Sequence, residues 1–111
     1  MTYLSSKLKE LREKNNVSQY KLAADLDIKR SAYGNYETGM SYPEYETLEK
    51  IADYLKVNIS ELLGYDEDFD KSIDLLTESE EIKKQIKIYF YKKYRKVPSE
   101  SKILDILREI L

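Results

Sequence analysis

The 111 residues of this chain include no cysteine and no histidine. Their absence excludes metal sites built from Cys or His, disulfide bonds, thiol redox chemistry and nucleophiles activated by a His base. Glycine occurs only three times and proline twice, and no phosphate-binding loop of the G-x-G-x-x-G or G-x-x-x-x-G-K type is present. Only carboxylates, Lys, Ser and Tyr are left for catalysis, so we expect no enzyme and no cofactor.

Long apolar runs are absent as well. No segment approaches the roughly 18 residues of a membrane-spanning helix, and the N-terminus has no apolar core of a signal peptide. Charged residues make up 36% and hydrophobic residues 41% of the sequence, which is typical of a globular protein. We therefore expect a cytoplasmic protein that binds no membrane.

Apolar residues recur mostly at spacings of three and four, which predicts an all-α fold. Five short helices are expected before Gly64, and the third of them covers about residues 30–37. Ser18 is placed to cap the second helix, and Gly39 is placed to end the third. Asp27 is expected to make the turn between these two helices, because Asp tolerates the left-handed backbone conformation.

Two further helices are expected near the C-terminus. Thr77 and Glu80 have the spacing of a capping box, with Thr at the N-cap, for a helix that runs to about Arg95. Pro98 ends it, since the residue before a proline is disfavoured in a helix. Ser99 can then cap a last helix that continues to Leu111.

The composition divides the chain into three parts, which are residues 1–64, 65–77 and 78–111. Residues 1–36 carry seven basic and four acidic groups, residues 37–70 carry two and ten, and residues 71–111 carry ten and seven. Residues 37–70 are thus acidic and lie between two basic regions. The part 65–77 is interpreted as an acidic linker or a short helix. Its acidic cluster at 66–70 can hold a divalent cation only weakly, and we expect no metal site.

The most informative pattern lies in residues 18–39, SQYKLAADLDIKRSAYGNYETG, followed by TLEKIADYL at 47–55. Together with the flanking apolar residues from 4 to 64, it resembles the helix-turn-helix of the Cro/C1 (Xre-type) phage-repressor family. The small, apolar and capping positions all fall in register with that family. The resemblance implies a five-helix, lambda-repressor-like DNA-binding domain whose third helix lies in the major groove of double-stranded DNA.

The resemblance also implies roles for individual residues. Base edges are expected to be contacted by Lys29, Arg30, Ser31 and Asn35. Phosphates are expected to be contacted by Ser18, Gln19, Lys21, Met40, Ser41 and Tyr42, the last three through hydroxyl groups and backbone N–H groups. Arg12 and Glu37 occupy positions where the family often has a buried ion pair.

Tyr33 and Tyr36 are bulkier than the aliphatic pair that is typical of the family, and two further positions also depart from the usual pattern. Asp27 replaces the common glycine of the turn. Gly34 lies inside the third helix, where glycine costs about 1 kcal/mol relative to alanine. Gly34 has two interpretations, either a close approach of the backbone to DNA or a tolerated surface glycine.

The C-terminal part is interpreted as a two-helix dimerisation segment, because its last helix has an apolar stripe that needs cover. The interface residues are expected to be Ile82, Ile86, Tyr89, Ile103, Ile106, Leu107 and Ile110. Residues 83–96 hold seven basic and no acidic groups among aromatic residues. This run favours a packed helix with solvated lysines over a second anionic-surface site.

These observations favour a dimeric transcriptional repressor that binds a pseudo-palindromic operator and is released by an inducing or antirepressor protein. The alternative is an antitoxin-like or adaptor protein whose C-terminal helices bind a partner protein.

Overall fold

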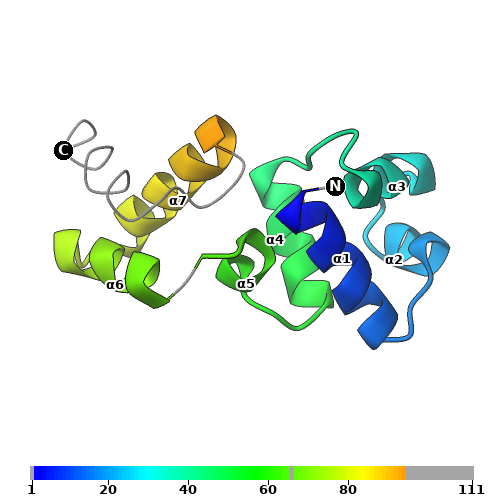
Figure 1. Ribbon diagram of the computed structural model, residues 1–111, viewed down its shortest axis with the longest axis horizontal. Coiled ribbons are helices and arrows are strands. Elements are labelled where there is room, and N and C mark those ends of the chain that lie inside the picture. Colours follow the sequence, from blue (N-terminus) through cyan, green and yellow to red (C-terminus); the bar gives the residue numbers. More distant parts are fainter. Residues whose placement is uncertain (1, 66, 95–111) are drawn as a thin grey trace. The chain divides into compact units, whose positions relative to one another are not determined.

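The computed structural model describes residues 2–65 and 67–94. These residues form helices and no strands, which confirms the all-α prediction (Figure 1). The chain divides into two compact units, residues 1–62 and 63–111. The helices are α1 (Tyr3–Lys14), α2 (Gln19–Asp25), α3 (Arg30–Thr38), α4 (Tyr45–Tyr54), α5 (Ile59–Leu63), α6 (Glu67–Leu76) and α7 (Glu80–Tyr94). The last predicted helix, after Ser99, lies outside the described residues.

The core of the first unit follows the apolar spacing of its helices. Leu4, Leu8 and Leu11 of α1 are buried, as are Leu22 and Ala23 of α2. The other large contributions come from Tyr33, Leu48, Ile51, Leu55 and Leu62. Helix α3 packs against both α1 and α2, and this packing fixes which of its faces is left to solvent.

Several helices of the first unit end in left-handed residues. Gly39 ends α3 with φ 82°, a conformation in which a Cβ atom is disfavoured. Asp27 has φ 56°, which confirms the left-handed turn predicted there. Asn16 and Lys56 adopt the same conformation, with φ 56° and 61°. Ser18 caps α2, since its Oγ accepts from the Lys21 N–H at 3.0 Å.

The second unit is built on aromatic residues of α6 and α7. The rings of Phe69 and Phe90 meet edge to face with centroids 5.1 Å apart, and Tyr65 stacks at 4.3 Å on Phe69. Lys83 and Lys87 of α7 pair with Asp74 and Asp70 of α6, at 2.9 and 3.4 Å. Two lysines of the basic run are thus neutralised by α6, which occupies most of the acidic segment 65–77.

The predicted N-cap of α7 is wrong. The helix begins at Glu80, and the Oγ of Ser79 accepts from the Ile82 N–H at 3.3 Å. Thr77 instead accepts from the Ser79 N–H at 3.1 Å. Its hydroxyl closes a local turn two residues ahead, so the helix begins later than the capping-box spacing indicates.

Candidate nucleic-acid interface

Helices α2 and α3 form a tight helix-turn-helix. The turn is closed by the Ile28 N–H, which donates to the Ala23 carbonyl at 2.8 Å. Ala23 is buried, and its small side chain lets the two helices cross closely. Tyr33 on α3 is fully buried on the side that faces the core. The opposite side of α3 therefore faces solvent.

All of the predicted base-reading residues are exposed. Arg30, Ser31 and Asn35 lie on α3, and Lys29 is the N-cap residue just before it. The side chains of Lys29, Ser31 and Asn35 make no hydrogen bond to another described residue, so they are available to a ligand. Arg30 differs, because one of its guanidinium nitrogens donates to Gln19 Oε1 at 2.7 Å.

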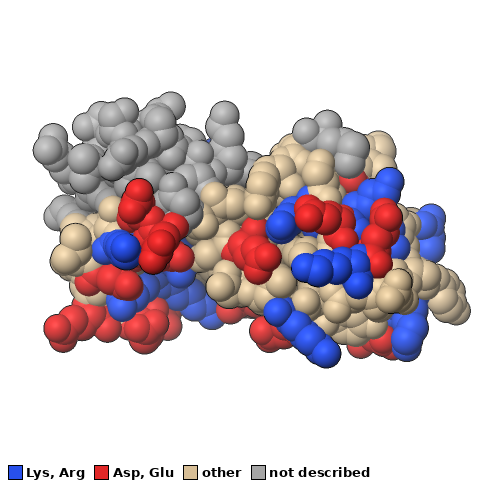
Figure 2. Space-filling view, turned by 60° about the horizontal axis from the view of Figure 1, so that its bottom comes forward, with Lys and Arg blue, Asp and Glu red and all other residues tan. Residues whose placement is uncertain are grey.

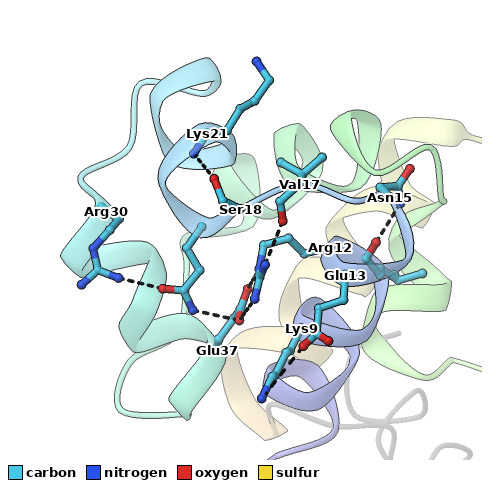
Figure 3. A network of polar contacts seen from close by, with 11 residues as sticks. Lys9, Arg12, Glu13, Asn15, Val17, Ser18, Lys21, Arg30 and Glu37 are labelled. Carbon is cyan, nitrogen blue, oxygen red and sulfur yellow. Dashed lines mark hydrogen bonds and ion pairs between the residues drawn. The ribbon is translucent and has the colours of Figure 1, made fainter.

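Arg12 and Glu37 join α1 to α3 beneath this face (Figure 3). Arg12 Nε donates to Glu37 Oε2 at 2.6 Å, and a second guanidinium nitrogen donates to Oε1 at 3.1 Å. The third nitrogen donates to the Val17 carbonyl at 2.8 Å, just before α2. Gln19 Nε2 also donates to Glu37 Oε1, at 3.0 Å. One buried carboxylate thus holds α1, α2 and α3 together.

The pKa of Glu37 is set by two opposing effects. Burial raises it, since only 3% of the residue is exposed. The hydrogen bonds from Arg12 and Gln19 lower it and prevail, so the pKa lies below its ordinary value of 4.5. Glu37 is therefore ionised at neutral pH and only accepts hydrogen bonds.

This lowered pKa predicts a pH-dependent stability. Because the unfolded chain binds a proton more readily at Glu37 than the folded chain does, the contribution of Glu37 is complete above pH 4.5 and is lost as the pH falls further. Urea unfolding at a series of pH values, followed through the amide NMR signals of α3, measures it. Glu37→Gln should reduce this pH dependence, whereas Glu46→Gln, at an exposed glutamate of α4, should leave it as in the wild type.

The predicted phosphate-contacting residues lie in two places, at the start of α2 and in the loop after α3. Ser18 and Lys21 are exposed, and Gln19 is half-buried. The Nζ of Lys21 pairs with Asp25 at 3.2 Å, so binding of a phosphate competes with this pair. Asp25 also accepts from the hydroxyl of Tyr54 on α4 at 2.6 Å. The hydrogen bond from Tyr54 is the main cause that lowers the pKa of Asp25, and the hydrogen bond from Lys21 is the second largest.

The structure changes the expected contribution of the loop after α3. The backbone N–H groups of Met40 and Ser41 donate to the Asn35 carbonyl, at 3.0 and 3.3 Å. They help to close the end of α3 and are not free to bind a phosphate. A phosphate contact through the backbone N–H of Met40 or Ser41 is therefore not expected, whereas the hydroxyl groups of Ser41 and Tyr42 belong to half-exposed residues.

Charge on the surface is mixed. Figure 2 shows acidic and basic side chains interspersed on the face that it presents. On α1, Lys7 pairs with Glu10 at 3.7 Å and Lys9 with Glu13 at 4.0 Å. Attraction to an anionic ligand thus depends on the few cationic groups near the helix-turn-helix, chiefly Lys21, Lys29 and Arg30.

Gly34 lies between Arg30, Ser31 and Asn35 on the exposed face of α3. A methyl group there would meet Gln19 Oε1 at 3.5 Å and an Arg30 guanidinium nitrogen at 3.6 Å, which are ordinary contact distances. Gly34→Ala should therefore raise the free energy of unfolding by about 0.5–1 kcal/mol, because alanine favours a helix. Urea unfolding measures this gain, and a loss of stability would contradict it. DNA binding by the same variant separates the two interpretations of Gly34, since only a close backbone approach makes the methyl group harmful.

The predicted dimerisation residues are placed unevenly. Ile82 is 47% exposed, whereas Ile86 is 3% exposed and already covered. Tyr89 is half-exposed, and Lys93 Nζ lies 5.4 Å from its ring centroid. The other four residues, Ile103, Ile106, Leu107 and Ile110, lie outside the described part of the chain.

Comparison with known proteins bears on this helix-turn-helix directly. A family model described as "Helix-turn-helix" matches residues 8–62. The control protein C.MunI of a Mycoplasma species is 41% identical over 60 residues, which are 53% of this chain and 81% of that protein. The chain belongs to the Cro/C1-type helix-turn-helix family of transcriptional regulators. Members of this family bind DNA, and the matched residues 8–62 contain the helix-turn-helix of residues 18–39.

Other relatives of this helix-turn-helix protein regulate transcription in opposite directions. The transcriptional activator BcrR of Enterococcus faecalis is 36% identical over 87 residues, which are 78% of this chain and 40% of that protein. The cryptic phage CTXphi transcriptional repressor RstR of Vibrio cholerae is 35% identical over 60 residues, or 54% of each chain. The helix-turn-helix protein thus spans about half or less of these two relatives. No solved structure matches this chain significantly.

Proposed function

We propose that this protein is a dimeric, sequence-specific DNA-binding repressor that recognises a pseudo-palindromic operator. The observation that carries the proposal is the exposed face of α3, where Arg30 and Asn35 face solvent. An arginine can pair with O6 and N7 of guanine, and an asparagine can pair with N6 and N7 of adenine. Lys29 and Ser31 flank these two, while Ser18, Gln19 and Lys21 on α2 are placed to hold the phosphates that fix the register.

A dimer is proposed because one helix-turn-helix contacts only a few base pairs. The second unit supplies apolar surface for it, since Leu75 is 89% exposed and Leu76 and Ile82 are also exposed. Because Ile86 is already buried, the described part of the interface draws on the side of Ile82. Two-fold pairing places two copies of α3 about 34 Å apart, one turn of DNA.

The proposed effect on transcription is repression. The protein is proposed to act in the cytoplasm, on chromosomal or phage DNA. The repressor RstR supports repression. Activation is the second candidate, and the activator BcrR favours it because the match to BcrR covers more of this chain. Release from the operator would require an inducing or antirepressor protein, and no enzymatic activity of the chain itself is proposed. A reporter gene placed behind the selected operator distinguishes a fall from a rise in transcription.

The test of sequence-specific binding is a selection from a randomised duplex library with the purified full-length protein at about 0.15 M salt, where nonspecific attraction is reduced. Enrichment of a pseudo-palindrome with half-sites one turn apart is expected. Binding without enrichment would contradict base reading by α3. Enrichment of a single half-site, together with a monomer in sedimentation, would contradict the dimer.

A further inference from the structure

Lys21, a predicted phosphate contact, is already paired within the protein. Its Nζ lies 3.2 Å from Oδ2 of Asp25, about one helical turn later on α2. Residues four positions apart lie on the same side of a helix, so Asp25 shares the face of α2 from which Lys21 would reach a phosphate. The side chain of Lys21 is 66% exposed, which leaves it room to exchange this partner for DNA.

The carboxylate of Asp25 is also held from a second helix. The hydroxyl of Tyr54 on α4 donates to the same Oδ2 atom, at 2.6 Å. This hydrogen bond first, and that from Lys21 second, lower the pKa of Asp25, so the carboxylate is ionised at neutral pH. Because the bond to α4 restricts the side chain, the negative charge stays beside Lys21.

We infer that Asp25, oriented by Tyr54, competes with DNA phosphates for Lys21 and thereby limits the affinity of this protein for DNA of any sequence. The inference rests on the proposed phosphate contact of Lys21. A carboxylate and a phosphate oxygen are both anionic acceptors for an ammonium group. Lys21 must therefore give up its bond to Asp25 in order to bind DNA, and the cost of that bond is subtracted from the gain.

The expected size of this effect follows from the exposure of the pair. Exposed ion pairs at this spacing are weak, so the loss of the pair should change the stability of the fold little. A dimer on DNA would break two such pairs, which corresponds to a factor of about three to five in Kd. The factor should be the same for every sequence, because phosphate contacts carry no base information.

The experiment compares four full-length proteins, which are wild type, Asp25→Asn, Lys21→Met and the double variant. Asparagine keeps an oxygen that can accept from Tyr54 but carries no charge. Fluorescence anisotropy at about 0.15 M salt measures their affinity for the selected operator and for random duplex DNA. Asp25→Asn should bind both about three- to fivefold more tightly, and Lys21→Met should bind both more weakly. In the Lys21→Met background, Asp25→Asn should lose most of its gain.

The double variant is needed because an aspartate can also repel DNA directly. Direct repulsion does not depend on Lys21, whereas competition does. Asp53→Asn is the matched control, since it removes the same charge from an exposed aspartate of α4, and it should change the affinity by less than about twofold. The gain of Asp25→Asn should shrink as the salt concentration rises, because salt screens exposed charges.

Tyr54→Phe is a second and independent variant. It removes the hydroxyl that restricts Asp25 but leaves the charge in place. Because the carboxylate then has more freedom, its bond to Lys21 requires more ordering. Tyr54→Phe should therefore bind DNA more tightly than wild type, by a smaller factor than Asp25→Asn, and only where Lys21 is present.

Each other outcome overturns part or all of the inference. If Asp25→Asn gains equally with and without Lys21, then Asp25 repels DNA directly and does not compete for Lys21. If Lys21→Met weakens binding but Asp25→Asn gains nothing, the competition alone fails. If Lys21→Met leaves the affinity unchanged, the proposed phosphate contact of Lys21 fails and the inference fails with it. If Tyr54→Phe binds as wild type while Asp25→Asn gains, orientation by Tyr54 is excluded.

Discussion

Glu37→Gln is expected to lower the free energy of unfolding of the first unit by about 3–5 kcal/mol. The substitution keeps the shape of the side chain but removes its charge, and it leaves the Arg12 guanidinium buried without a counter-ion. The side chain of Arg12 is only 12% exposed, so water cannot replace the carboxylate. Since small domains have about 5–15 kcal/mol of stability in total, this loss is a large fraction of it. Urea unfolding followed by the amide signals of α3 measures the change.

Two control variants test whether this loss of stability comes from the unpaired buried charge. Glu46→Gln makes the same chemical change at an exposed site on α4 and should alter the stability by less than about 0.5 kcal/mol. The double variant Arg12→Met and Glu37→Leu replaces the ion pair by apolar side chains and should recover much of the loss, because the buried charge is then gone. If Glu37→Gln matches Glu46→Gln in stability, the pair does not hold the three helices together.

Arg30→Ala is expected to weaken binding to the selected operator by about 2–6 kcal/mol, or about 30-fold to 10⁴-fold. Each bidentate arginine–guanine pair discriminates by about 1–3 kcal/mol, and a two-fold symmetric complex contains two copies of Arg30. The preference at one base pair of each half-site should be relaxed. Fluorescence anisotropy with operators altered at single base pairs, at about 0.15 M salt, measures both effects.

Affinity for random duplex DNA separates base reading from charge. Arg30→Ala should lower it far less, since a single charge is lost. Lys50→Ala, which removes one positive charge from α4 outside the helix-turn-helix, should leave the preference at every base pair unchanged. An equal loss on the operator and on random DNA would show that Arg30 acts as a charge and not as a reader.

The backbone of the helix-turn-helix was predictable because its determinants are local. Asp27 and Gly39 take the left-handed conformation at the positions where apolar periodicity stops. Ser18 caps α2 because it directly precedes the first helical residue. Spacing along the chain is sufficient for such features, since each depends on residues only a few positions apart.

The contacts of the site depend on distances that a sequence does not contain. Gln19 and Arg30 are 11 positions apart and meet only because of the angle at which α2 and α3 cross. The N–H groups of Met40 and Ser41 were assigned to phosphate, but the chain turns back so tightly after Gly39 that the Asn35 carbonyl takes both. Such bonds compete with ligands, and only the folded chain reveals the competition.

The second unit was less predictable for a related reason. Ile86 was expected at a dimer interface because it shares a helical face with Ile82, yet it is buried within a single chain. A helical wheel indicates which residues need cover but not what covers them. Thr77 likewise satisfied a capping pattern, while Ser79, two residues later, is the residue that caps α7.

The left-handed residues at the helix ends affect how this domain can evolve. Lys56 has a positive φ and a Cβ atom, a combination that costs about 1–2 kcal/mol relative to glycine. Substitutions on the reading face that favour a new operator will mostly destabilise the fold. A glycine at position 56, remote in sequence from that face, can offset one of them. A stabilising substitution at a helix end can thus compensate for a destabilising one on the reading face. The DNA preference of this regulator can then change while its fold is kept.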